Sequence, residues 1–308
     1  MLPYGMFDLA RSADEARRSE KLASIYHRGQ ALVWNGREVL AELIARHGGI
    51  HMTERDRHAL ARIFSILMWG ELAAWRISAQ LADRLEPLEA KMAATGQAHD
   101  EARHFYVLHD YLAALGEAPS RPDRHTEAVL EAVLATAWLP AKVLGMQLLI
   151  ENFALTIFHL VRRVNVEPVL TDLLAYYEKD EARHVGLGVQ QLPMWLKAMR
   201  HSERVRLFLF QARIVTHTLR ALKTLEPDLA TLGLSAREII DDSMSKQEDT
   251  SVQLFEELGV RSTVTREILW RGIGAARELV FSAGAPTATR VASTVRMLWH
   301  RPDFTASA

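Results

Sequence analysis

The five-residue stretch DEARH occurs twice in the chain, at residues 100–104 and again at residues 180–184. A glutamate precedes each copy at the same distance, Glu71 before the first copy and Glu151 before the second. Outside these positions the two units share little sequence. The contrast indicates a repeated structural unit in which a site, rather than the packing around it, constrains the residues.

The spacing within each unit predicts a helix hairpin. On one straight helix, Glu71 and Glu101 would lie about 45 Å apart at 1.5 Å per residue, too far to act together. A chain reversal near Pro87 gives two antiparallel arms of about 22 Å and returns the two glutamates to the same height. The second unit has the equivalent turn signal at Pro168.

Within each DEARH copy, the glutamate and the histidine are three residues apart and therefore share one helix face. Two hairpins can thus bring four carboxylates and two imidazoles together. Burying four carboxylates in a dry core would cost several kcal/mol each without compensation, and two divalent cations supply four positive charges. The predicted ligands of this two-metal site are Glu71, Glu101, His104, Glu151, Glu181 and His184.

The kinds of ligand favour particular metals. Carboxylate oxygens with one imidazole per ion suit iron or manganese better than zinc. We expect two iron ions, with manganese as the alternative at one or both positions. A single Glu-x-x-His is commonplace on solvated helices, but Glu71 and Glu151 lie on otherwise apolar helix faces, where an unpaired charge is rare.

The composition excludes several classes of function. The chain has 308 residues, 49% of them hydrophobic, which predicts a soluble protein with a sizeable core. A formal net charge of -1 provides no basic field, so we expect no nucleic acid as a partner. The absence of cysteine excludes disulfides, thiolate zinc sites and Cys-ligated iron–sulfur centres. No secretory signal is apparent, and we expect a cytoplasmic protein.

Helical periodicity runs through the chain, and alternating strand patterns are missing, so the predicted fold class is all-α. We expect one domain over residues 1–308, with a metal-binding four-helix bundle over about 54–198 and further helices within 9–47 and 203–299 packed on it. Polar residues interrupt the apolar stretch 133–161, which predicts a core helix rather than a membrane span. The expected helices cover about 9–31, 37–47, 54–84, 87–115, 124–138, 141–164, 168–198, 203–225, 235–258, 262–281 and 287–299.

These motifs resemble those of the ferritin-like di-iron carboxylate superfamily. Its oxygen-activating members carry a glutamate and then DExRH about thirty residues later, twice. The resemblance covers about residues 54–198 and implies a ferritin-like four-helix bundle. It also implies that Glu101 and Glu181 are the glutamates that bridge the two ions.

The resemblance further implies roles for the other charged residues of the DEARH copies. Asp100 and Asp180 would accept hydrogen bonds from the ligand imidazoles, and Arg103 and Arg183 would pair with those aspartates. The alternative for both Asp and Arg pairs is a solvent-exposed helix salt bridge.

Gln97 and Tyr177 each lie four residues before a glutamate of a DEARH copy and should face the site. In the N-oxygenases of the superfamily a further histidine ligand occupies the position of Tyr177, and this departure counts against close kinship. Tyr177 would either donate a hydrogen bond or an electron at the site, or be a core tyrosine whose hydroxyl finds a partner. We favour the core tyrosine.

The resemblance implies a non-haem di-iron oxygenase or oxidase that uses O₂ as co-substrate to oxidise a small apolar or acyl substrate. Hydroxylation, desaturation and N-oxygenation stay open. Because the chain has no redox centre of its own, an external reductase or ferredoxin, or the substrate itself, would supply electrons. The alternatives are a ferroxidase or iron-handling protein, a di-manganese catalase-like protein, and a helical interaction module with a vestigial site.

Two regions have more than one interpretation. The apolar side chains near the expected site would either line a substrate pocket or pack the core; they are Trp69, Trp75, Phe105, Leu155 and Phe158. The C-terminal helices would cover the bundle, form a homodimer interface or shape substrate access.

Overall fold

The described part of the computed structural model, residues 13–258, 264–282 and 284–299, consists of helices and their connections and contains no strand. The all-α prediction is confirmed. The helices are α1 (Ala13–Ala31), α2 (Gly36–His47), α3 (Glu54–Arg84), α4 (Leu88–Ala114), α5 (Arg124–Ala135), α6 (Leu139–Val143), the π-helical η1 (Leu144–Ile150), α7 (Glu151–Val164), α8 (Pro168–Ala198), α9 (His201–Thr231), α10 (Ala236–Leu258), α11 (Val264–Val280) and α12 (Thr287–Trp299).

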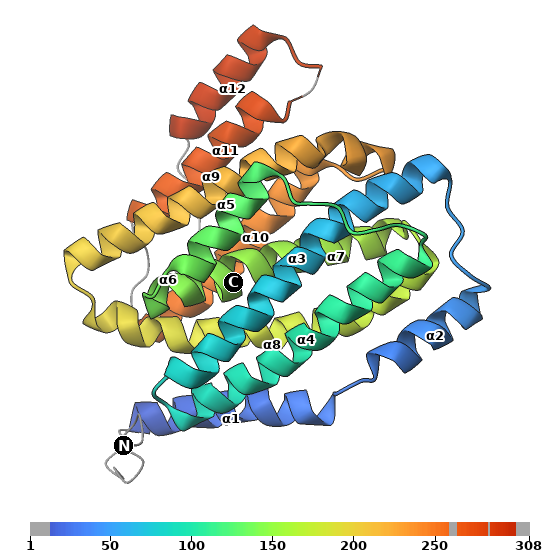
Figure 1. Ribbon diagram of the computed structural model, residues 1–308. Helices are drawn as coiled ribbons and strands as arrows, with labels where there is room; N and C mark the ends of the chain where they lie inside the picture. The colour runs from blue at the N-terminus through green and yellow to red at the C-terminus, as the bar shows by residue number, and fades with distance from the viewer. Residues whose placement is uncertain (1–12, 259–263, 283, 300–308) are drawn as a thin grey trace.

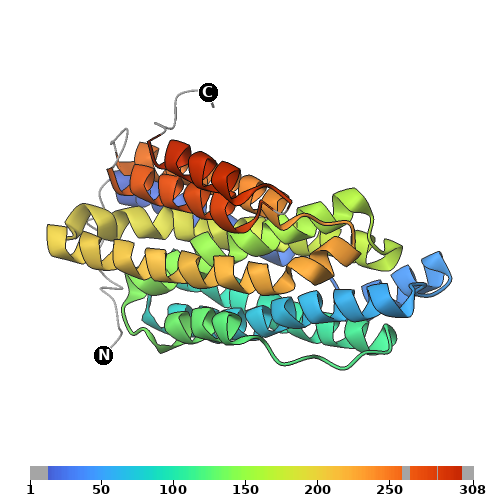
Figure 2. The same ribbon diagram turned by 90° about the horizontal axis from the view of Figure 1, so that it is seen from above.

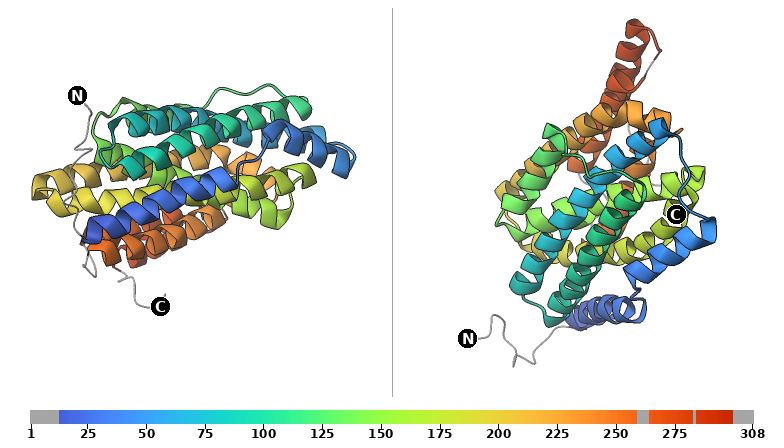
Figure 3. Two further views of the ribbon diagram at one scale, coloured as in Figure 1. Left: turned by 90° about the horizontal axis from the view of Figure 1, so that it is seen from below. Right: turned by 45° about the vertical axis from the view of Figure 1, so that its right-hand side comes forward.

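Two antiparallel hairpins form the centre of the molecule, α3 with α4 and α7 with α8 (Figure 1). Helix α4 packs on α8, and α3 packs on η1, which closes the two hairpins into a four-helix bundle. Helices α9 and α10 cover one side of this bundle, as the view from above shows (Figure 2). Helix α1 lies along α4 and α8 on the other side, and the α11–α12 hairpin projects from the bundle (Figure 3).

The two chain reversals lie where the turn signals predicted them. Helix α3 ends before Leu85, and α4 begins at Leu88 directly after Pro87. Helix α7 ends at Asn165 in the left-handed conformation, with φ 54°, and Pro168 is the first residue of α8. The buried Glu167 caps α8, because its carboxylate accepts hydrogen bonds from the first backbone N–H groups of that helix.

Helix α9 is longer than its sequence suggested. We expected it to end near residue 225, but it continues through Pro227 to Thr231. Leu222, Leu225 and Leu229 are buried on one face at helical spacing. Burial of this apolar stripe on both sides of Pro227 outweighs the single backbone hydrogen bond that a proline removes.

The central helix contains a π-helical segment directly before Glu151. We expected a regular helix over 141–164, whereas the chain is helical over 139–164 with η1 inside it. A wider turn shifts the direction of every side chain that follows, and such segments are frequent at functional sites. Helical periodicity gave no sign of it, because all residues of η1 except Ile150 are buried.

This central helix, Leu139–Val164, is also the one described helix that is long and apolar enough to cross a membrane. Of its most apolar window, 78% is buried inside the bundle. The helix therefore has the burial of a core helix, in agreement with the sequence prediction.

Gly188 of α8 lets that helix approach η1 closely. A Cβ atom at Gly188 would lie 2.8 Å from side-chain atoms of Gln147 and Leu148, whereas a Cβ at Gly186 would meet only Ile25 at 3.5 Å. We predict that Gly188→Ala lowers the free energy of unfolding by about 1–3 kcal/mol, because the added methyl overpacks the core. Gly186→Ala on the same helix should be neutral or stabilising by up to about 1 kcal/mol. Urea unfolding of both variants tests the packing, and equal effects would contradict it.

Lys142 of α6 is a buried lysine whose ammonium lies at the end of α5. Its ammonium donates hydrogen bonds to the carbonyl oxygens of Val133 and Leu134, 2.9 and 3.1 Å away. Burial, with the nearby charges of Arg84 and Arg76, lowers the pKa of Lys142 from 10.5 to about 8. The folded protein therefore releases this proton at a lower pH than the unfolded chain does.

Because the unfolded chain binds the Lys142 proton more tightly, the stability contributed by this residue rises with pH between about 8 and 10.5. We predict that the wild type gains stability relative to Lys142→Met as the pH rises through this window, by at most about 3 kcal/mol. Urea unfolding at a series of pH values measures the difference. The exposed Lys197→Met is the control, and a constant difference between wild type and Lys142→Met would contradict the prediction.

Candidate metal centre

The six side chains predicted as ligands come from four helices and meet in the middle of the bundle. Each is at most 5% exposed, although each carries an ionisable group. They are Glu71 on α3, Glu101 and His104 on α4, Glu151 at the start of α7, and Glu181 and His184 on α8. The paired hairpins therefore bring together all six residues, as the spacing predicted for a common site.

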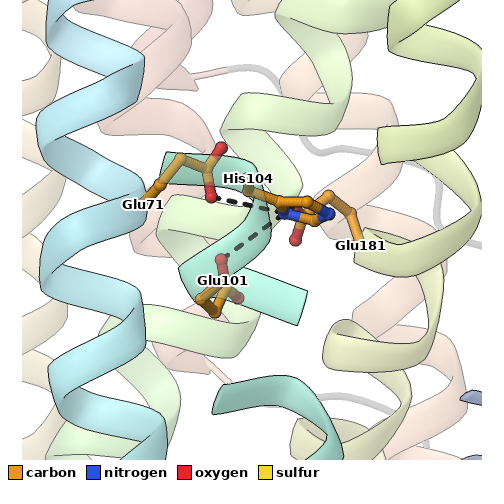
Figure 4. A group of neighbouring side chains, drawn as sticks. All are labelled: Glu71, Glu101, His104 and Glu181. Carbon is orange, nitrogen blue, oxygen red and sulfur yellow. Dashed lines mark ion pairs between the residues drawn. The ribbon is translucent and has the colours of Figure 1, made fainter. Parts of the chain in front are cut away.

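One group consists of Glu71, Glu101, His104 and Glu181 (Figure 4). One ligand atom of each of these four residues lies within 4.8 Å of all the others. His104 Nδ1 is 3.6 Å from a carboxylate oxygen of Glu71, 3.6 Å from one of Glu101 and 3.0 Å from one of Glu181. Three carboxylates thus surround one imidazole nitrogen.

The second group consists of Glu101, Glu151, Glu181 and His184, with the same spacing. His184 Nδ1 is 2.9 Å from a carboxylate oxygen of Glu101, 2.8 Å from one of Glu181 and 4.0 Å from one of Glu151. Glu101 and Glu181 belong to both groups. These two carboxylates therefore occupy the position that a bridging pair would need, with a different oxygen turned toward each histidine.

The outer nitrogen of each histidine points at an aspartate from the other DEARH copy. His104 Nε2 lies 3.1 Å from Asp180, and His184 Nε2 lies 3.4 Å from Asp100. A proton on Nε2, donated to the aspartate, leaves the Nδ1 lone pair facing the carboxylates. We expected aspartates beside the imidazoles from the resemblance, but the exchange of partners between α4 and α8 was not predicted.

Arg103 and Arg183 each bind both aspartates. Arg103 donates hydrogen bonds to Asp100 at 2.6 Å and to Asp180 at 2.8 Å, and Arg183 donates to the same pair. The side chains of Arg103 and Asp180 are 5% and 2% exposed. The alternative of solvent-exposed salt bridges is therefore wrong for these pairs.

Trp34, in the link between α1 and α2, is a part of the site that sequence reasoning missed. Its indole Nε1 donates a hydrogen bond of 2.8 Å to Asp180, and the Arg103 guanidinium lies 4.7 Å over its ring. Trp34 thereby completes a hydrogen-bonded series from the indole through Asp180 to His104. In the sequence, this residue is only a tryptophan directly before Asn35, the N-cap of α2. That position does not indicate a long-range contact.

Gln97 faces the centre as predicted. Its amide nitrogen lies 3.1 Å from Glu101 and 3.1 Å from Glu151, and its amide oxygen accepts from Gln147 at 3.4 Å. Tyr177 stacks its ring on His104 with ring centres 4.2 Å apart, while its hydroxyl donates to the backbone carbonyl of His104 at 2.8 Å. This is the satisfied core tyrosine that we favoured.

The carboxylates of the centre differ in their affinity for protons. Burial raises the pKa of Glu71 and Glu151 well above the usual value, and the charge of Glu181 adds to the rise. Burial acts on Glu101 too, but the charge and hydrogen bonds of His184 and His104 outweigh it and hold the pKa of Glu101 well below its usual value.

The imidazoles hold protons in return. Burial would lower the pKa of His104, but the hydrogen bond with Asp180 and the nearby glutamate carboxylates outweigh burial and raise it. The charges of Glu181 and Glu101 raise the pKa of His184 against burial in the same way. The centre thus requires compensating positive charge, which either protons or metal cations can supply.

The residues present fit a pair of metal ions. Three buried polar atoms, Glu101 Oε2, Glu181 Oε1 and His104 Nδ1, have no hydrogen-bond partner. Buried polar atoms without a partner are costly, and these three converge within one group. Oxygen and imidazole donors in this ratio are those of iron and manganese sites rather than zinc or soft-metal sites.

A cavity of about 100 Å³ reaches the centre between α3, α7 and α9, and Glu71 and Glu151 are part of its wall. The apolar wall is formed by other residues than the five that we considered, among them Leu67, Met146 and Phe153. Trp75 does not line this cavity and is 41% exposed, so it is not packed in the core either. The packing between helices decides which apolar residues line the cavity, and the sequence pattern does not show that packing.

Neither a family model nor a curated protein matches the sequence. Among solved structures, a protein from Synechococcus with aldehyde deformylating oxidase activity matches at a TM-score of 0.55 and 15% identity, over 79% of this chain and 98% of that one. The chain has the ferritin-like fold. A variant of an R2-like ligand-binding oxidase with an aerobically reconstituted Mn/Fe cofactor matches at a TM-score of 0.48 and 14% identity, over 83% and 92% of the two chains.

Asp180 joins α8 to α4 and to the α1–α2 link. We predict that Asp180→Asn lowers the free energy of unfolding of the metal-free protein by about 3 kcal/mol, because the two arginines then share the single charge of Asp100. Asp172→Asn removes a partly exposed aspartate that pairs with His47 and Arg46, and should cost less than about 1 kcal/mol. Urea unfolding compares the two, and similar losses would contradict the assigned role of Asp180.

Proposed function

We propose that this protein is an O₂-dependent di-metal oxidoreductase, a non-haem oxygenase or oxidase. The observation that carries the proposal is the pair of buried groups, each with three carboxylates and one imidazole, that share Glu101 and Glu181. In the proposed centre these two glutamates would be ligands of both ions. Glu71 and His104 would be the other ligands of one ion. The glutamate of α7 and the histidine of α8 would be the other ligands of the second ion.

The proposed metals are two iron ions, with manganese as the alternative at one or both positions. The donor set and the need for compensating charge support this assignment. A pair of such ions supplies electrons to O₂ and a Lewis-acidic site for it when bound.

The chain's own residues would prepare the site for this chemistry. Asp180 and Asp100 hold the imidazoles with their Nδ1 atoms toward the ions, and the two arginines hold the aspartates. Gln97 donates its N–H to two of the carboxylates and restricts their orientation. The buried apolar helix faces exclude water, so that oxidising equivalents would reach the substrate rather than solvent.

The proposed reaction needs a source of electrons. In an oxygenase, one atom of O₂ enters the substrate and the other leaves as water, which consumes two electrons and two protons from a donor. In an oxidase, the substrate itself supplies them. With no cysteine for an iron–sulfur centre in the sequence, we propose a separate reductase or ferredoxin for the first case. A homodimer and a cytoplasmic location stay predictions.

The oxidase activity of the Synechococcus protein supports the reaction class proposed here, and its aldehyde substrate is not transferred to this chain. An apolar or acyl substrate agrees with the apolar wall of the cavity beside Glu71 and Glu151. Hydroxylation, desaturation and N-oxygenation are all compatible with this geometry.

Metal content tests the proposal. We predict about two iron ions per chain after anaerobic loading with ferrous salt and removal of excess metal, and rapid O₂ consumption on mixing with air-saturated buffer. Because Glu101 and Glu181 belong to both groups, Glu101→Gln or Glu181→Gln should abolish binding of both ions. Glu71→Gln and Glu151→Gln should each leave about one ion, since each belongs to a single group.

Glu54→Gln, at a side chain that is 80% exposed at the start of α3, is the matched control and should keep both ions. Circular dichroism of each variant separates loss of metal from loss of fold. Many irons per chain would instead indicate a ferroxidase or iron-handling protein. The absence of stoichiometric metal from the folded wild type would refute the di-metal proposal and leave the interaction module.

A further inference from the structure

A second, larger cavity lies on the side of the bundle that the C-terminal helices cover. Its volume is about 660 Å³, within the usual range of small-molecule sites. The end of α8, helices α9, α10 and α11, and the segment from η1 into α7 line it. We call this cavity the chamber. Most of its wall is apolar and includes Leu192, Phe208, Ile214, Leu219 and Ile240.

The chamber is continuous in its walls with the small cavity at the metal centre. Leu149, Phe153, Thr218 and Leu222 line both. Glu71 and Glu151 are part of the wall of the small cavity and do not line the chamber. A flexible apolar chain in the chamber would therefore approach the candidate metal centre through this shared wall.

The chamber has one basic end. Lys197, His201 and Arg204 line it where α8 passes into α9, and all three side chains are exposed to solvent there. Arg204 donates a hydrogen bond to the carbonyl of Leu196, which holds its guanidinium at the end of α8. Among the described residues that line the chamber, Glu248 on α10 is the one acidic residue. An apolar chamber with a cationic mouth is complementary to an amphiphile with an anionic head.

We propose that the chamber binds a long single-chain carboxylate, with the head group at Lys197, His201 and Arg204 and the apolar chain directed toward Glu71 and Glu151. As a statement about the substrate, this inference rests on the proposed function. As a statement about binding, it stands on the chamber alone. It also assigns a role to helices α9 to α11, which form the substrate-binding wall that the four-helix bundle lacks.

The distance between the basic mouth of the chamber and the candidate metal centre restricts where such a molecule could be oxidised. Lys197 follows Glu181 by sixteen residues of α8, which corresponds to about 24 Å along the helix. A carboxylate held at the mouth cannot reach the centre. The part of the chain that approaches Glu71 and Glu151 is therefore distant from the head group, and the structure assigns oxidation to that distant part.

Binding of straight-chain carboxylates to the full-length protein as purified tests the inference without any measurement of activity. In calorimetric titrations below the critical micelle concentrations, we expect one molecule of dodecanoate to bind per chain. Affinity should rise about tenfold for each added pair of methylene groups from octanoate to dodecanoate, because the chamber buries them. The double variant Lys197→Gln/Arg204→Gln should weaken dodecanoate binding about tenfold and leave dodecanol binding unchanged.

Two matched pairs serve as controls. Arg213→Gln removes an exposed arginine of α9 that does not line the chamber and should have no effect. Ser243→Phe fills the chamber at a hydroxyl that has no hydrogen-bond partner, and should abolish binding of both ligands. Ser245→Phe, on the exposed side of the same helix, should abolish neither.

Failure of dodecanoate to bind, or equal effects of the double variant on dodecanoate and dodecanol, would overturn the inference. Metal content measured on the same samples separates the two proposals. A chain that binds two metal ions but no dodecanoate would contradict the proposed role of the chamber and leave the proposed function intact. A chain that binds dodecanoate but takes up no metal would contradict the proposed function and leave the proposed role of the chamber intact.

Discussion

The burial of four carboxylates and two imidazoles in one dry region is the constraint on which the rest of this structure depends. Each carboxylate would strongly repel the others without compensation, and the raised pKa values of Glu71 and Glu151 express that cost, whereas the lowered pKa of Glu101 reflects compensation by the histidines. The helices must therefore present all six groups at one height, and the surroundings must hold each group in place. Both requirements explain why the two DEARH copies and their upstream glutamates are the repeated part of the chain.

The network outside the six groups joins the two hairpins. Asp180 accepts hydrogen bonds from Trp34 and Arg103 and lies beside His104, so it connects α8 with α4 and with the link between α1 and α2. Asp100 makes the reciprocal connection to α8 through Arg183 and His184. A buried ionic network of this kind contributes less to net stability than to a unique arrangement, because removing one partner leaves buried charge behind. We infer that it sets the register between α4 and α8.

Much of this arrangement could be predicted from residue spacing. The two reversals, the i and i+3 pairs of α4 and α8, and the inward direction of Gln97 follow from helix geometry and were found where expected. The π-helical η1, the continuation of α9 through Pro227 and the exposure of Trp75 were not expected. In each of these cases the packing of neighbouring helices overrides the local pattern, and the pattern carries no information about the neighbour.

The sequence by itself determined which side chains share a helix face and at what height they meet, because the 3.6-residue repeat and the two turns are local properties. It therefore determined the all-α class, the paired hairpins and the identity of the six converging residues. Only the tertiary structure decided that each aspartate serves the histidine of the other hairpin, that Trp34 joins them, and that α9 to α11 enclose a chamber. Those contacts join segments that are far apart in the sequence. They depend on how the helices pack on one another, and no local sequence pattern encodes that packing.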